Sequence, residues 1–108
     1  MLIDTNKLMQ QTKDVFLGRI HRSETEGKPI QRYNLFHYFG TDIKKVDLTL
    51  KRVFVLHNFL DGFIIVYYTV IMYDHDNNIV SGSWDIFSLW RIHKENGKWS
   101  IIAIKESP

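Results

Sequence analysis

The stretch from residue 62 to residue 73, GFIIVYYTVIMY, constrains the fold more than any other part of the chain. It is too short to cross a membrane as a helix, and its Ile, Val, Tyr, Phe and Thr residues favour a β-strand. A strand that is buried on one face alternates apolar with polar residues, whereas both faces of this strand are apolar. The sequence therefore predicts a central strand that needs cover on both sides.

Length and composition are those of one globular domain, which we place at residues 1–108. The 108 residues are 44% hydrophobic and 24% charged, and a chain of this length buries roughly two-thirds of its unfolded surface on folding. The net charge of +2 is spread along the chain, so nucleic acid is not an expected partner.

Targeting and redox features are sparse. The chain has no cysteine, which excludes disulfides, thiolate metal sites and a cysteine nucleophile. The first residues, MLIDTNK, lack the apolar core of a signal peptide. We expect a cytoplasmic protein that does not enter a membrane.

Two helical segments are predicted before the strands. Apolar residues at three- and four-residue spacing predict a helix of about four turns that starts at Asp4 or Thr5 and ends near His21. Residues 23–29, SETEGKP, form a loop. Residues 30–39 fit a short helix ended by Gly40, although a strand is also possible there.

The remainder predicts a four-stranded antiparallel meander. Residues 46–57 alternate imperfectly, with a change of phase at Lys51 and Arg52 that is typical of a β-bulge. Turns at residues 58–61 and 74–78 flank the central strand, and residues 79–93 form a long third strand. Asn96-Gly97 indicates a type I′ hairpin turn into a last strand at residues 99–105. The fold class is therefore α+β.

Strand registers assign the side chains to two faces. Pairing His57 with Phe63, Arg52 with Tyr68 and Tyr68 with Asp85 predicts one face that the helices cover and a second face that they do not. The helix-covered face would hold Val53, Val55, Phe63, Ile65, Tyr67, Ile71, Trp84, Ile86, Trp90, Ile92, Trp99 and Ile101. The second would hold Phe54, Leu56, Ile64, Val66, Tyr68, Val70, Met72, Phe87, Leu89, Ile102 and Ile104, interrupted by Arg52, Asp85 and Arg91.

Two helices cannot cover both faces. An apolar sheet face of this size usually marks a partner surface, and a two-fold contact uses the same patch twice. We therefore expect a homodimer packed sheet to sheet.

The order of elements, together with residues 83–104, SWDIFSLWRIHKENGKWSIIAI, resembles the nuclear transport factor 2-like superfamily. This superfamily includes ketosteroid-isomerase-like and SnoaL-like members. The resemblance covers about half of the chain and implies a cone-shaped sheet wrapped around helices, dimers formed sheet to sheet, and an optional pocket inside the cone. Because the family normally has three helices before its long strands, a trimmed cone or a one-helix cystatin-like relative fits the 46 residues available here.

Most chemical motifs are absent. The five histidines lack metal-ligand spacing, and the glycines form no phosphate-binding motif. Asp74, Asp76 and Asn78 resemble the start of a calcium loop, but Ile79 stands where that loop needs glycine. We expect no metal, no cofactor and no catalytic set that could be named.

One polar constellation remains: Arg52, Tyr68 and Asp85 would form a row across three strands. The opposite charges in such a row would neutralise one another through hydrogen bonds, and the row could fix the register of a dimer. Alternatively, it would line a pocket in which Asp85 accepts a proton and Tyr68 donates a hydrogen bond to an enolate oxygen. His57, Trp84 and Trp90 are the other candidates for ligand binding or for an interface.

These patterns favour a non-catalytic binding or protein-interaction module that acts as a homodimer. The alternative is a small enzyme, or a binder of a small apolar ligand, that uses the interior of the cone. A second alternative is a small phage-type inhibitor of a host protein. An enclosed cavity would favour the enzyme or binder, and a filled cone would favour the interaction module.

Overall fold

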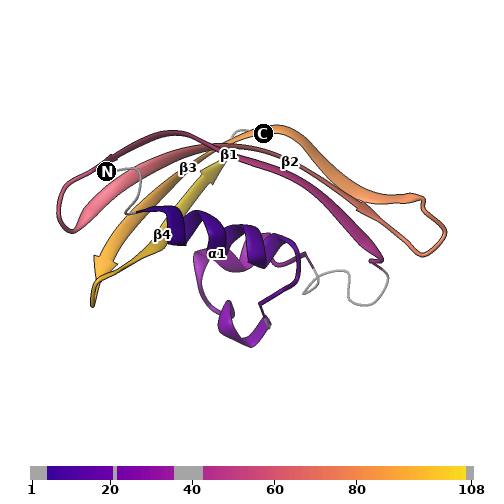
Figure 1. Cartoon of the computed structure of the whole chain (residues 1–108), viewed down its shortest axis with the longest axis horizontal. Helices are drawn as coiled ribbons and strands as arrows, with labels where there is room; N and C mark the ends of the chain where they lie inside the picture. Colours follow the sequence, from indigo (N-terminus) through magenta and orange to yellow (C-terminus); the bar gives the residue numbers. More distant parts are fainter. Residues whose placement is uncertain (1–4, 21, 36–42, 107–108) are drawn as a thin grey trace.

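A computed structural model describes residues 5–20, 22–35 and 43–106. It contains helix α1 (Asn6–Phe16), two 3₁₀ segments, η2 (Arg22–Glu24) and η3 (Pro29–Tyr33), and four strands, β1 (Lys45–His57), β2 (Asp61–Tyr73), β3 (Ile79–Glu95) and β4 (Lys98–Glu106). The strands form one antiparallel sheet in the order β1-β2-β3-β4. The sheet is bent, with α1 and the 3₁₀ segments under its concave side (Figure 1). This architecture confirms the predicted α+β fold.

Helix α1 is shorter than predicted. It buries Leu8, Thr12, Val15 and Phe16 against the sheet, as the apolar spacing required. It stops at Phe16 because Gly18 takes a left-handed φ of 74° while its N–H bonds to the carbonyl of Val15, an arrangement that ends helices.

The second helical segment is confirmed only in part. Pro29–Tyr33 forms the 3₁₀ segment η3, and its Ile30 and Tyr33 side chains are buried. Residues 36–39 and Gly40 lie outside the described residues. Ser23 and Glu24 of the predicted loop, together with Arg22, form η2.

One turn and one bulge confirm predictions from the sequence. Asn96 and Gly97 have φ angles of 52° and 78°, as a type I′ turn requires. The register of β1 against β2 shifts between Arg52 and Phe54, which is the bulge that the change of phase predicted.

The predicted faces of β2 were wrong. The concave face holds Ile64, Val66, Tyr68, Val70 and Met72, all of them buried, whereas Phe63, Ile65, Tyr67 and Ile71 point to the convex side. The Asn58 N–H bonds to the Asp61 carbonyl, so that His57 pairs with Gly62 and not with Phe63. This slip of one residue moves every β2 side chain to the opposite face.

The other strands were assigned better. Trp90, Ile92, Trp99 and Ile101 lie in the core, as predicted. Phe54, Leu56, Phe87 and Ile102 are exposed on the uncovered face, also as predicted. Val53 and Trp84 are exposed although we expected them in the core, and Ile104 packs against the core although we expected it on the second face.

Candidate functional site

Aromatic rings fill the space under the concave side of the sheet. Phe16 of α1 stacks on Tyr33 of η3 at 4.5 Å and contacts Tyr68 of β2 at 5.2 Å between ring centroids. Tyr33 also lies 5.6 Å from Tyr68 and 6.0 Å from Trp90. Four rings from four elements, α1, η3, β2 and β3, therefore fill the space beneath the sheet.

A hydrogen-bond network joins these rings to the end of β4. The Tyr68 hydroxyl donates to Glu106 Oε2 at 2.8 Å, and the Tyr33 hydroxyl donates to the same oxygen at 2.7 Å. The Trp90 indole N–H donates to the Tyr33 oxygen at 3.0 Å, and the Ser88 hydroxyl lies 3.0 Å from that oxygen. The network ties β2, β3, β4 and η3 together around one carboxylate.

In this network the tyrosine hydroxyls are donors and the Glu106 carboxylate is their acceptor. Burial, reinforced by the Glu106 carboxylate, raises the pKa of Tyr68 well above its ordinary value, and burial also raises the pKa of Tyr33. Both phenols therefore stay protonated and act as donors. Arg32 adds a third donor group to Glu106 at 3.2 Å. Through these contacts the Glu106 carboxylate links β2, β4 and η3.

The predicted row of Arg52, Tyr68 and Asp85 does not form. Arg52 pairs with Val66 in the sheet and donates to the Thr5 hydroxyl at the start of α1 at 2.7 Å. Tyr68 pairs with Ile86, and Asp85 lies on the convex side, where it accepts a hydrogen bond from Tyr67. A bulge in β3 explains why Tyr68 does not pair with Asp85: the register of β2 against β3 shifts between Tyr68 and Val70, and Asp85, with a left-handed φ of 55°, lies at this shift.

The other three candidates lie in different surroundings. His57 contacts the Trp99 ring edge-on at 4.9 Å, at the end of β1. Trp84 is half exposed, and its ring lies over Gly82 on the convex side. Trp90 is fully buried in the network. Of the six candidates, the structure joins only Tyr68 and Trp90, through Tyr33 and Glu106.

Sequence reasoning missed Tyr33 and Glu106. Tyr33 was expected only as part of the short helix at residues 30–39, and the last strand was expected to end at Lys105. The available signal was Ser88, a polar residue on a core face that needs a hydrogen-bonding partner. Nothing in the sequence pointed to a tyrosine 55 residues earlier as that partner.

The convex side of the sheet carries a cluster of exposed apolar side chains, which we call the convex patch. It consists of Phe54, Leu56, Phe63, Trp84, Phe87 and Ile102. Neighbouring strands hold these side chains together: Leu56 pairs with Phe63, and the rings of Tyr67 and Phe87 lie 5.4 Å apart. No described segment covers the patch (Figure 1).

The described residues hold neither a metal-binding cluster nor a membrane-spanning helix. They contain no group of three His, Cys, Asp or Glu side chains that could hold a metal ion. No helix among them is long and apolar enough to cross a membrane.

Comparison with known proteins supports the fold. No family model and no curated protein matches the chain. A solved structure from Nostoc punctiforme, described as a domain of unknown function with a cystatin-like fold, is 22% identical with a TM-score of 0.50. The match covers 72% of this chain and about half, 49%, of that one. It shows a shared cystatin-like α+β fold, and it carries no information on activity.

Proposed function

We propose that this protein is a non-catalytic protein-interaction module that acts as a homodimer through the convex patch. The observation that carries the proposal is the contrast between the two sides of the sheet. The concave side is filled by its own aromatic rings, whereas six large apolar side chains on the convex side remain about half exposed.

The size of the patch supports a dimer interface. Aromatic side chains bury roughly 150–250 Å² each. Four of the six patch residues are aromatic, so six half-exposed side chains leave on the order of 500 Å² of apolar surface. Patches of about 300–600 Å² on monomers are often functional. A typical interface buries about 800 Å² on each partner, and the buried core of homodimer interfaces is about 65% apolar. An apolar convex patch on the order of 500 Å² would therefore supply the apolar part of a typical interface.

The filled interior supports a non-catalytic role. An enzyme or small-molecule binder would need room beside Tyr68, but Phe16 and Tyr33 already contact its ring. We also propose that the chain is a trimmed member of the nuclear transport factor 2-like superfamily. Helix α1, the bent meander and the outer sheet face that no described segment covers support this assignment.

Sedimentation equilibrium of the wild type and two charge variants tests the proposal. Phe63→Glu places a carboxylate within the patch, and Phe59→Glu makes the same change at the β1–β2 turn, where the side chain is 92% exposed. We expect a dimeric wild type, a dimeric Phe59→Glu protein and a monomeric Phe63→Glu protein with an unchanged circular dichroism spectrum.

A wild type that stays monomeric at about 100 μM, a concentration at which even modest interfaces associate, would overturn the homodimer. We would then expect the convex patch to contact a different protein, as in the alternative in which this chain inhibits a host protein. A Phe63→Glu protein that remains fully dimeric would show that the dimer forms through another surface.

A further inference from the structure

Three adjoining hollows run along the outer edge of β4, and together we call them the β4 groove. The first, of about 610 Å³, lies between α1 and the β3–β4 turn. The second, of about 300 Å³, shares Leu8 and Gln11 with the first, and the third, of about 620 Å³, shares Lys28 and Pro29 with the second. The groove thus follows β4 from Lys98 to Ile104.

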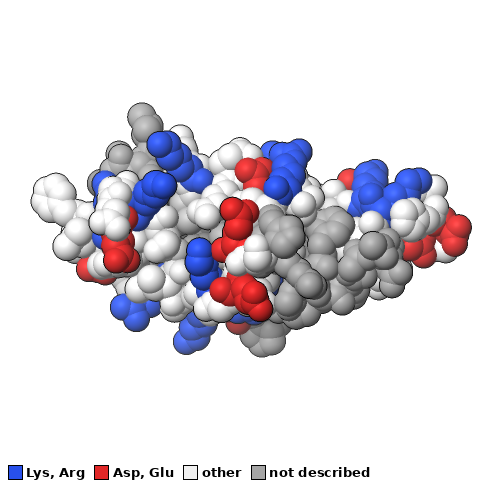
Figure 2. Space-filling model, turned by 90° about the horizontal axis from the view of Figure 1, so that it is seen from below, with Lys and Arg blue, Asp and Glu red and all other residues white. Residues whose placement is uncertain are grey.

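The groove is lined by basic side chains. Lys7, Lys28, Arg32, Lys94 and Lys98 line it, and no Asp or Glu does. Arg32 is paired with Glu106, but the four lysines form no ion pair with a carboxylate of the described residues. Figure 2 shows Lys and Arg side chains over the half of the helix-bearing face where β3 turns into β4, with fewer acidic side chains beside them.

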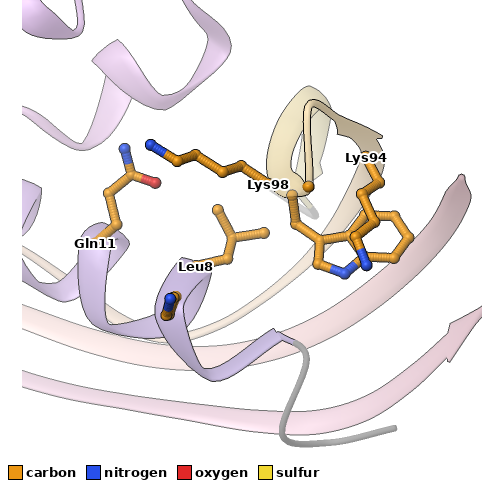
Figure 3. Close-up of a pocket in the computed structure, with 7 residues that line it drawn as sticks. Leu8, Gln11, Lys94 and Lys98 are labelled. Atoms are coloured by element: carbon orange, nitrogen blue, oxygen red, sulfur yellow. The ribbon is translucent and has the colours of Figure 1, made fainter.

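The floor of the groove is apolar. Leu8, Ile30, Trp99 and Ile101 line it beneath the charged groups. In the first hollow, Lys98 extends from the β3–β4 turn toward Gln11, and Leu8 lies between them (Figure 3). The Lys94 ammonium lies 5.7 Å from the centre of the Trp99 ring. A ligand that fits this groove combines negative charges with apolar groups.

The strand beside the groove has a free edge. Among the described residues, β4 is the last strand of the sheet and pairs with β3 alone. The outer backbone groups of an edge strand can pair with an added strand. Residues 98–104 span roughly 20 Å at 3.3 Å per residue, which is the length of a seven-residue extended peptide.

We propose that β4 and its groove bind an extended acidic peptide of a partner protein as an added strand. The peptide backbone pairs with the free edge of β4. Because strand side chains alternate between the two faces of a sheet, its carboxylates point to the helix-bearing side and meet Lys7, Lys28, Lys94 and Lys98, while its apolar side chains point to the convex side of β4. This inference rests on the proposed role as an interaction module and names the chemistry of the partner.

Fluorescence anisotropy with a labelled seven-residue peptide of alternating glutamate and valine tests the proposal. We expect it to bind and to weaken as NaCl rises from 50 to 500 mM, because salt screens exposed charges. The double variant Lys7→Glu/Lys98→Glu should bind roughly ten-fold more weakly, since two attractions become repulsions. The control Lys44→Glu/Lys51→Glu changes net charge equally at the other edge of the sheet, beside and within β1, and should bind as the wild type does.

Two further peptides test the strand geometry and the sign of the charge. A version with two valines replaced by proline cannot complete the backbone pairing and should lose most of its affinity. A lysine–valine version should not bind. The proposal is overturned if the glutamate peptide fails to bind at 1 mM, if the control variant weakens binding as much as Lys7→Glu/Lys98→Glu, or if either altered peptide binds equally well. Phe63→Glu should leave peptide affinity unchanged, so failure of the groove and failure of the dimer are separate results.

Discussion

Replacing Tyr68 with phenylalanine tests the buried network most cleanly, because Tyr67 provides a matched control on the same strand. Both phenols donate to a carboxylate, Tyr68 to Glu106 on the buried face and Tyr67 to Asp85 on the exposed face. Tyr68→Phe keeps the ring contacts with Phe16 and Tyr33 and removes only the hydroxyl. The difference between the two variants therefore isolates the effect of burial on the hydrogen bond.

The expected cost follows from the partner of each hydroxyl. A hydrogen bond to a charged group contributes about 1.5–3 kcal/mol. Since Glu106 keeps Tyr33 and Arg32 as donors, we expect Tyr68→Phe to lower the free energy of unfolding by about 2 kcal/mol. Tyr67→Phe should cost about 0.5 kcal/mol or less, because Asp85 is exposed and water replaces the lost donor.

Urea unfolding followed by tryptophan fluorescence measures both costs. All proteins should be compared at one concentration, because dimerisation stabilises by mass action. The slope of the free energy against urea should be unchanged, which shows that the folded and unfolded states expose the same surface. Equal losses for the two variants, or a loss below about 0.5 kcal/mol for Tyr68→Phe, would refute the structural role of the network.

Three other predictions follow from the same contacts. The pKa values of Tyr33 and Tyr68 are raised in the folded protein, so unfolding releases protons above about pH 10. The free energy of unfolding in urea should therefore fall as pH rises from 9 to 11. An equally steep fall in Tyr33→Phe would contradict the assignment of this pH dependence to the buried tyrosines. Gly62→Ala places a Cβ 2.4 Å from His57 Cβ and 2.7 Å from the Leu56 carbonyl oxygen; it should cost more than about 3 kcal/mol in the same assay, and a cost below about 1 kcal/mol would argue against this close approach. Phe87→Ala should weaken the dimer about ten-fold in sedimentation equilibrium, as truncation of a central aromatic residue does, and an unchanged dissociation constant would place Phe87 outside the interface.

Much of the fold was predictable because it depends on local patterns. The stripe of Leu8, Thr12 and Val15 specified a helix, and Asn96-Gly97 specified its turn. The phase change near Arg52 located a bulge. Each of these signals lies within a few neighbouring residues, where spacing and turn chemistry act directly.

The faces of β2 were not predictable in the same way. Both faces are apolar, so the hydrophobic pattern did not distinguish one register from a register shifted by one residue. The deciding contact is the Asn58–Asp61 bond in the first turn, supported by the Asn58 side chain accepting from the Leu60 and Asp61 N–H groups.

The candidate site was less predictable than the fold. The network joins Tyr33 to Glu106 across 73 residues of sequence, and long-range pairing of this kind leaves no local signal. The β4 groove was missed for a related reason. Lys7, Lys28 and Lys98 are far apart in the sequence and line one surface only because α1 and η3 lie beside β4.

The central claim is that the convex patch forms the contact between two copies of this chain. An isotope-filtered NOE experiment on a mixed dimer of labelled and unlabelled protein tests it most directly. We predict cross-subunit signals among Leu56, Phe63, Phe87 and Ile102. Cross-subunit signals only from other surfaces, or none at a concentration where the protein is dimeric, would contradict the account.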